Sequence, residues 1–204
     1  MKSFRIRFCS AALIALSSGF WLPLAQAGVF NIPRFLAPGD SSLGLEPELV
    51  FTNGAGLGFN AKYTYGLTEL NNVTAIVGTG SGPRRFRFGG NMTFDFIPDV
   101  ESQPGIGIAV QGVYYKLPVD GRFELTGIPY LHKNFITKGN EVDPFLAIPI
   151  GMGFSSGTYR VISNVVVGAI FKNPSIEKFR FSLELGINVN HSESYISGGA
   201  IFYP

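Results

Sequence analysis

The feature that most constrains the fold of this chain is an alternation of apolar and polar residues with a period of two. Four segments show it most clearly: 57–65, 85–96, 142–154 and 178–190. In the last segment, apolar residues from Phe179 to Val189 occupy the odd positions, and polar or small residues occupy the even ones. Successive side chains of a strand point to opposite faces, so each segment has one apolar and one polar face. The pattern predicts an all-β protein of long amphipathic strands.

Six further strands are expected from weaker alternation, which brings the number to ten. They lie at about 43–51, 71–79, 105–116, 122–132, 158–171 and 195–203. Short connections rich in Gly, Pro, Ser and Asn separate the ten segments, as at 80–83 and 172–175. Such regular, short connections favour an up-and-down antiparallel barrel. Eight strands are the alternative, because a pattern does not fix strand boundaries.

The first 27 residues have the features of a cleaved signal peptide. Lys2, Arg5 and Arg7 precede an uncharged apolar stretch, Ala11 to Leu24, that is too short and interrupted to span a membrane as a helix. It ends at Ala25-Gln26-Ala27, and the expected cleavage lies between Ala27 and Gly28. Residues 28–40 contain two internal prolines and no alternation, so we interpret them as an irregular N-terminal arm. Residues 41–204 then form a single barrel domain by length.

Removal of this signal would change the composition. It would take away Cys9 and Trp21, the only cysteine and tryptophan. It would also lower the formal net charge from +2 to −1, because three of the 16 basic residues and none of the 14 acidic residues lie in it. Nothing then suggests a nucleic-acid partner, which requires a clustered basic surface. Disulfide frameworks and zinc–thiolate sites are excluded as well.

The charges help to decide between a membrane barrel and a soluble one. They lie on the polar faces of the predicted strands, and the apolar faces carry none. An Arg or Lys facing lipid at mid-membrane costs roughly 2–4 kcal/mol, whereas a soluble barrel tolerates charges more freely. The segregation therefore favours a membrane barrel with an apolar outside and a lumen filled by paired charges. The network expected there consists of Glu46, Glu48, Lys62, Arg85, Arg87, Asp95, Arg180 and Glu184.

At the C-terminus, alternation continues to the end of the chain. The residues that share one face of this last segment are Tyr195, Ser197, Gly199, Ile201 and Tyr203. With these features the chain resembles the small outer-membrane β-barrel proteins of Gram-negative bacteria. The resemblance implies an integral outer-membrane protein in contact with outer-membrane lipid, exported through the signal peptide. It also implies that the barrel-insertion machinery reads the C-terminal strand. Pro204 departs from the aromatic residue that usually ends such chains.

Residues capable of chemistry are few. His191, Ser192, Glu193 and Ser194 bring together the residue types of a hydrolytic triad. However, Ser192 and Ser194 are one and three places from His191, and neither spacing puts both side chains on one face of a strand. A polar turn is the competing interpretation. No spacing of His132 or His191 with acidic residues suggests a metal site, and no cofactor is expected.

Prolines interrupt two neighbouring predicted strands. Pro129 lies in 122–132, and Pro144 and Pro149 lie in 142–154. Because proline removes a donor from the ladder, these residues suggest a weakly bonded lateral seam. Barrels that modify lipid A are similar in admitting lipid through proline-lined gaps. The alternative is that the prolines occupy bulges or strand ends, where strand prolines are commoner.

Three functional hypotheses follow. The first is a barrel with a structural or surface role, or a narrow pore whose lumen is filled by paired charges. The second is a lipid-modifying barrel enzyme that performs acyl transfer or hydrolysis and admits lipid laterally. The third is a soluble periplasmic β-barrel that binds an apolar ligand. If both chain ends lie on one side, the longer connections (98–104 and 133–141) also lie on that side.

Overall fold

The computed structural model describes residues 35–204 except 53–54, 82–84, 117–119 and 138. The predicted signal peptide, its cleavage site at Ala27–Gly28 and residues 28–34 of the predicted arm lie outside the described residues. In the described part of the chain, no helix is long and apolar enough to cross a membrane. The described elements are all strands, which bears out the all-β prediction.

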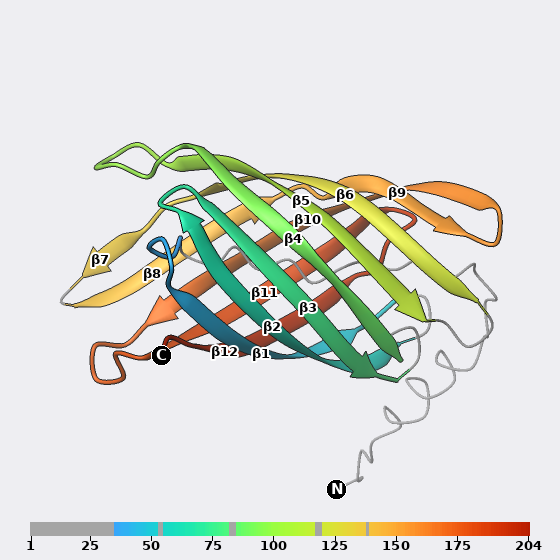
Figure 1. The fold of residues 1–204 in the computed structure, drawn as a ribbon, viewed down its shortest axis with the longest axis horizontal. Coiled ribbons are helices and arrows are strands. Elements are labelled where there is room, and N and C mark those ends of the chain that lie inside the picture. Colours follow the sequence, from blue (N-terminus) through green and yellow to red (C-terminus); the bar gives the residue numbers. More distant parts are fainter. Residues whose placement is uncertain (1–34, 53–54, 82–84, 117–119, 138) are drawn as a thin grey trace, which may run out of the picture.

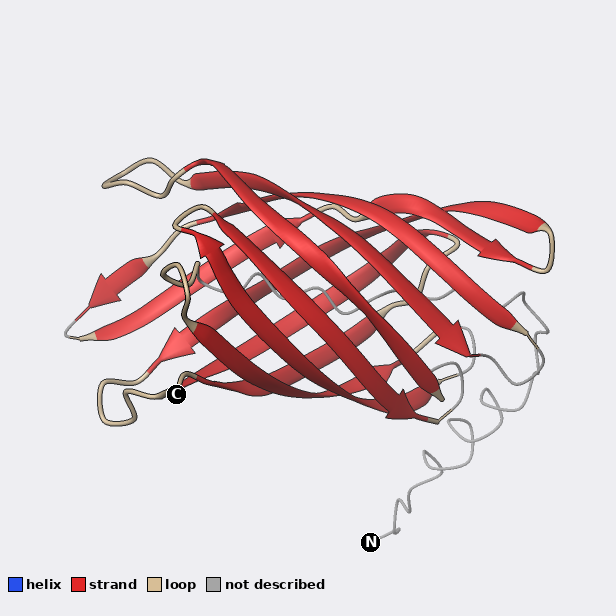
Figure 2. Cartoon of the chain, viewed as in Figure 1, coloured by secondary structure: helices blue, strands red, loops and turns tan. Residues whose placement is uncertain are grey.

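Twelve strand segments form one antiparallel sheet (Figures 1 and 2). They are β1 (Ser41–Val50), β2 (Gly56–Thr68), β3 (Asn71–Gly80), β4 (Phe86–Ile97), β5 (Gly105–Lys116), β6 (Gly121–His132), β7 (Phe135–Thr137), β8 (Asn140–Ala147), β9 (Ile150–Ser155), β10 (Thr158–Lys172), β11 (Phe179–Asn190) and β12 (Tyr195–Phe202). Sequential strands are neighbours, as an up-and-down barrel requires. The first strand pairs with the last, from Leu43↔Phe202 to Val50↔Tyr195, so the sheet closes on itself.

β8 and β9 are two parts of one barrel strand. Both pair with β6 on one side and with β10 on the other. The register against β6 is the same in both parts, since Gly127 lies opposite Ile150 and Tyr130 opposite Ala147. The interruption at 148–149 is therefore not a bulge. With β7 as a short hairpin extension of β8, the barrel has ten strands; the ten-strand prediction is confirmed and the alternative of eight is wrong.

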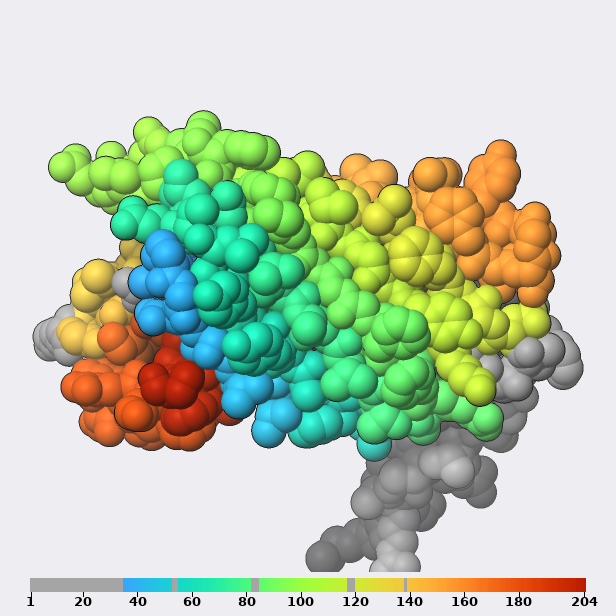
Figure 3. Space-filling model, in the orientation of Figure 1, coloured from blue at the N-terminus to red at the C-terminus, as the bar shows by residue number. Residues whose placement is uncertain are grey.

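The barrel carries its apolar residues on the outside. In β11, Phe181, Leu183 and Ile187 are 42, 51 and 48% exposed, whereas Ser182 and Glu184 are 8 and 2% exposed. The same alternation of exposed and buried positions runs through β1, β2 and β3. Figure 3 shows one side of this outer surface, on which the strands follow one another in colour bands. A soluble barrel requires its apolar faces inside, so the third hypothesis is wrong for this fold.

The two mouths of the barrel differ in their connections. At the mouth where β1 begins and β12 ends, which we call the C-terminal mouth, lie the longer connection 98–104 and the β7–β8 hairpin (Figure 1). At the opposite mouth the connections are short, for example Ser156–Gly157 between β9 and β10. The sequence placed the longer connections on the side of the chain ends, and the structure agrees. It adds that part of 133–141 is strand, where a loop was expected.

Candidate functional site: the lumen

One half of the lumen is a charged wall, formed by inward side chains of β1, β2, β4, β11 and β12. Lys62 Nζ lies 2.7 Å from Glu46 Oε2, and both side chains are buried. Arg87 forms an ion pair with Glu48, and the Asn60 side-chain amide donates to the same Glu48 oxygen at 3.2 Å. A charge removed from water is tolerated only when partners replace its hydration. Ion pairs therefore account for these charges inside the barrel.

The charged wall continues on β11 and β12. The Tyr195 hydroxyl donates to the carboxylate of Glu184, and both residues are almost fully buried. A further buried ion pair, Arg122 with Glu124, lies on β6 near the opposite mouth. Arg122 was not among the residues predicted for the network. Its signal was available in the sequence, because Arg122 and Glu124 are two residues apart and so share the polar face of one strand.

Three members of the expected network lie elsewhere. Arg85 is a correction: it precedes β4 and is exposed, so it is not part of the buried charged wall. Asp95 lies at the C-terminal mouth, where its Oδ2 is 3.7 Å from His132 Nε2. Arg180 is also at that mouth, and its Nη1 donates to Glu141 Oε2 at 3.2 Å. The expected single network is thus divided into separate groups along the barrel axis.

His132 stands between two carboxylates at the C-terminal mouth. Its Nδ1 lies 3.2 Å from Asp143 Oδ1, on the side of the ring away from Asp95. Sequence spacing did not suggest this group, because its members come from β4, β6 and β8. Among the described residues, no cluster of three or more His, Cys, Asp or Glu side chains could hold a metal ion.

Two small cavities border the charged wall. One cavity of about 10 Å³ is bordered by Asn60, Lys62, Arg87 and Gln111, among others. A second cavity of about 10 Å³ lies between Ser42, Glu46, Lys62 and Thr64. A volume of that size holds roughly one water molecule. Each of these two cavities therefore has room for about one water molecule.

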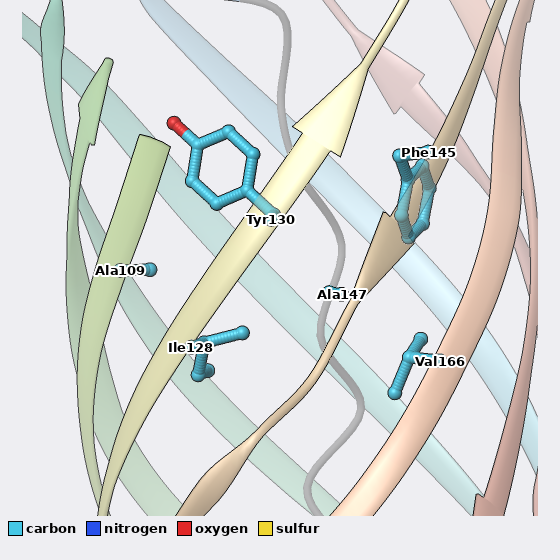
Figure 4. Packing of buried hydrophobic residues seen from close by; sticks show 6 residues of the cluster. All are labelled: Ala109, Ile128, Tyr130, Phe145, Ala147 and Val166. Atoms are coloured by element: carbon cyan, nitrogen blue, oxygen red, sulfur yellow. The ribbon is translucent and has the colours of Figure 1, made fainter. Parts of the chain in front are cut away.

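Part of the opposite side of the lumen is an apolar wall, which was not predicted from the sequence. Its buried residues are Ala109, Ile128, Tyr130, Phe145, Ala147 and Val166. They come from the adjacent strands β5, β6, β8 and β10, and Figure 4 shows their side chains beside the interruption between β8 and β9. The signal lay in the weak alternation of 105–116, 122–132 and 158–171. These strands alternate poorly because parts of both faces are apolar.

A short N-terminal strap, Phe35–Asp40, enters the lumen at the C-terminal mouth. Phe35 packs against the apolar wall. The backbone N–H of Leu36 donates to Asn72 Oδ1 at 3.3 Å, and that asparagine is fully buried. The strap thus reaches from the start of β1 to the far wall of the lumen. It is the described part of the segment expected to be an irregular arm.

Gly66 on β2 holds the strap in place. The backbone N–H of Gly39 donates to Gly66 O, and Gly66 N–H donates to Asp40 O, both at 3.0 Å. A Cβ on Gly66 would lie 2.4 Å from Ala37 O and 2.8 Å from Leu36 O. Only glycine lets the strap backbone come this close.

The residues considered for a hydrolytic triad form the turn between β11 and β12. His191 is exposed and has a left-handed backbone, with φ 45°. The Asn188 side chain accepts the Ser192 N–H at 3.0 Å, and Ser194 Oγ accepts the Asn188 N–H at 3.1 Å. The carbonyl of Glu193 accepts a hydrogen bond from Asn164 at 2.9 Å. These contacts support the interpretation of a polar turn.

Each of the three prolines at the predicted seam lacks the backbone N–H that another residue would donate to the ladder. Each still accepts one bond: the N–H of Ile148 donates to Pro129 O at 3.0 Å, that of Lys133 to Pro144 O at 3.1 Å and that of Asn164 to Pro149 O at 3.0 Å. In an antiparallel ladder such a pair normally exchanges two bonds, but proline has no N–H to return the second. Pro129 and Pro144 lie inside β6 and β8, not at bulges or strand ends. Lipid access through this region stays a prediction.

Comparisons with solved structures find other β-barrels. An outer membrane channel from Pseudomonas putida F1 is 10% identical, with a TM-score of 0.53, over 87% of this chain and 100% of that chain. A de novo designed transmembrane β-barrel is 12% identical over 83% and 99%, with a TM-score of 0.38. Ail, the attachment invasion locus protein of Yersinia pestis, is 12% identical over 81% and 98%, with a TM-score of 0.26.

The likeness to the Pseudomonas channel is one of fold, because the sequences share too few residues to carry a common site. No protein-family model and no curated protein matches the chain. The fold is therefore that of outer-membrane β-barrels of Gram-negative bacteria, as the sequence resemblance implied.

Proposed function

We propose that this protein is an integral outer-membrane β-barrel that forms a narrow passage, and that the strap closes the passage at its C-terminal mouth. The outward apolar faces support the membrane location, since a water-soluble barrel would not expose them. Signal cleavage after Ala27 and recognition of the C-terminal strand by the insertion machinery belong to the same proposal. In that strand Tyr195, Ser197 and Ile201 face the lumen, and Phe202 is the aromatic residue on the other face.

Aromatic residues near the strand ends fit this location. At the opposite mouth, Phe88 and Tyr114 lie with ring centroids 5.4 Å apart. At the C-terminal mouth, Phe179 and Phe202 lie 5.2 Å apart. Transmembrane barrels place such aromatic girdles at both interfaces of the apolar band.

We infer the passage from the way in which the lumen is filled. Buried ion pairs occupy the charged wall, and a separate piece of chain, the strap, covers the apolar one. The strap is held by two backbone hydrogen bonds at Gly66, by the bond from Leu36 N–H to Asn72 and by the packing of Phe35, not by strand pairing over its length. Because none of these contacts belongs to the barrel ladder, the strap can leave while the barrel stays closed on itself. The space between the apolar wall and the charged wall would then be open to water and ions.

Gly66→Ala tests this directly, because the added methyl group collides with the strap backbone. In planar bilayers, the wild-type protein should show rare and small conductance steps, and Gly66→Ala should show frequent open events. Gly44→Ala is the matched control: it also adds a methyl group to the lumen, but its nearest contact would be an ordinary 3.6 Å to Lys62 Cβ. Equal conductance in all three proteins would contradict the strap as the closure.

The location is tested by membrane fractionation and gel mobility. The protein should fractionate with the outer membrane and should migrate differently before and after boiling, because a closed barrel resists detergent until it is heated. A protein that is recovered in the periplasm and shows no mobility shift would contradict the whole proposal.

The enzyme hypothesis is not favoured by the His191 region, whose contacts are those of a turn. Replacement of His191 by Ala should leave the lipid composition of the outer membrane unchanged. The second part of the enzyme hypothesis, lateral lipid access at the three prolines, rests on different observations.

A further inference from the structure

We propose that the apolar wall binds a small uncharged apolar molecule in the place taken by Phe35, and that the interrupted ladder between β6 and the β8–β9 strand lets this molecule pass between lumen and membrane. This inference rests on the proposed membrane barrel. It names a ligand class and a route that the passage alone does not require.

The first step is the character of the wall. Six apolar or largely apolar side chains are gathered on one side of the lumen, and a phenyl ring lies against them. Phe35 comes from the strap, which is not part of the barrel wall, so its ring is a replaceable occupant. A molecule that takes its place must be apolar and of about that width, because binding sites select ligands by matching shape and polarity. The Phe35 ring thus occupies the position that we propose for the ligand.

The backbone ladder is interrupted at the same level along the barrel axis as the apolar wall. β6 and the β8–β9 strand have no paired residues between the Gly127↔Ile150 and Tyr130↔Ala147 pairs, although the register continues across the gap. Only the bond from Ile148 N–H to Pro129 O is made there, at 3.0 Å. Because Pro129 cannot return a bond, this part of the wall separates more easily than a regular ladder.

The neighbouring ladder is irregular at the same height. On the β10 side, Pro149 accepts from Asn164 N–H but has no donor to return. On the far side of β10, the register against β11 shifts between Ser163 and Asn164. Three adjacent ladders are therefore irregular together, which reduces the number of bonds that oppose a local opening.

The path from the apolar wall to the lipid runs between β6 and the β8–β9 strand. Ile128 and Ala147 lie on its luminal side and are buried, whereas Leu131, Ile148 and Ile150 lie on its outer side and are 44, 42 and 52% exposed. A molecule that moves from the wall into lipid passes only apolar side chains. An ion or strongly polar molecule would lose its hydration along this path without gaining hydrogen bonds. The path therefore selects uncharged apolar molecules.

A reversible crosslink tests the route. Leu131 and Leu146 lie directly opposite each other across the ladder beside the break. Such pairs have Cα atoms about 5.5 Å apart, within the range of a disulfide. The chain would carry Cys9→Ser, Phe35→Ala to vacate the site, and Leu131→Cys with Leu146→Cys. The measurement is the rate at which cells that express it take up N-phenylnaphthylamine, an uncharged dye that fluoresces in membranes.

The matched control is a crosslink in another interface. Leu49 and Ile196 also lie directly opposite each other, across the β1–β12 ladder, and both are outward and about equally exposed. Leu49→Cys with Ile196→Cys is therefore made in the same background. Boiled and unboiled gel samples show for each variant that the barrel is folded.

The expected result is faster dye uptake in Phe35→Ala cells than in cells without the barrel. Oxidation of the Leu131–Leu146 cysteine pair should reduce uptake to the rate of cells without the barrel, and a reductant should restore it; the Leu49–Ile196 pair should have no such effect. Uptake that is unaffected by the first crosslink, or equally reduced by both, overturns the route. No gain from Phe35→Ala overturns the binding site.

A second variant keeps the inference testable without cysteines. Ile128→Asp places a carboxylate in the apolar wall, and in the Phe35→Ala background it should abolish dye uptake. Ser182→Asp, on the charged side of the lumen, should not. These outcomes are separate from the ion conductance of Gly66→Ala, so failure of the lateral route and failure of the strap as a closure can be told apart.

Discussion

Two interruptions in the ladders of the barrel wall differ in what lies behind them in the lumen. In the β1–β12 ladder, no pairs form at Glu46 and Pro47, although the register is the same on both sides of the gap. Behind it are buried polar groups, and Ser197 Oγ–H donates to Pro47 O at 3.1 Å. At the interruption between β8 and β9, the groups behind are Ile128 and Ala147.

The comparison teaches that the consequence of a missing ladder bond depends on the side chains behind it. In the β1–β12 ladder, a luminal hydroxyl supplies a substitute hydrogen bond across the gap, and the Lys62–Glu46 ion pair ties β1 to β2 beside it. At the β8–β9 interruption, the apolar wall supplies contacts but no hydrogen bonds. The first place should therefore stay closed, and the second is the one that can open.

The largest effect is expected from breaking the charged wall. Arg87→Met removes the cation beside the buried Glu48 and should lower the free energy of unfolding by about 3–5 kcal/mol, the usual effect of removing one partner of a buried pair. The double variant Arg87→Met with Glu48→Gln should regain much of that loss. Chemical unfolding of the refolded barrel, followed by gel mobility, measures both. Equal losses in the single and double variants would show that the charge pair does not hold this side.

A smaller effect is expected from restoring ladder donors. Pro129→Leu returns an N–H toward Ile148 O, which is worth about 0.5–1.5 kcal/mol. It also removes the restriction that proline places on the unfolded chain, which lowers the free energy of unfolding by about 0.4–1 kcal/mol. Overall stability should thus hardly change, whereas the Ile148 amide should exchange its hydrogen more slowly. Dye uptake in the Phe35→Ala background should fall with Pro129→Leu and not with Pro47→Leu. The same fall in both would remove the difference between the two interruptions.

The smallest effect concerns a contact near the end of β6. Burial would raise the pKa of Asp99, but the Lys133 ammonium and the Asn134 N–H outweigh it and hold that pKa below its usual value. The stabilisation from this carboxylate is complete above its unfolded pKa of about 4 and is lost as the pH falls through the lower folded value. Its size is at most about 1 kcal/mol, because the pair is partly exposed.

The measurement is the unfolding midpoint of the wild type and of Asp99→Asn at neutral pH and near pH 3. The two proteins should differ at neutral pH and converge in acid, because the asparagine has no charge to lose. A constant difference at both values would mean that the contact acts through hydrogen bonding alone. Asparagine keeps only one of the two oxygens that accept from Lys133 and Asn134, so the part of the difference that changes with pH is the part that reports the charge.

Much of the fold could be predicted from the alternation, and part of the candidate site could not. The predicted strand 105–116 coincides with β5, and Lys62, Arg87 and Glu184 face the lumen as expected. Arg85 was misplaced because the alternation continues one residue beyond the strand. The apolar wall was missed because a strand with two apolar faces gives no alternating signal, and the strap was missed because its contacts are with residues far along the chain.

By itself, the sequence determined which side chains face lipid and which face the lumen, because that choice depends only on the period of two along each strand. It also determined the number of barrel strands, through the turns between alternating segments. Only the tertiary structure decided which luminal residues meet. Arg87 reaches Glu48, and Phe35 packs against the apolar wall. Such contacts follow from closure of β1 onto β12, which no local pattern encodes.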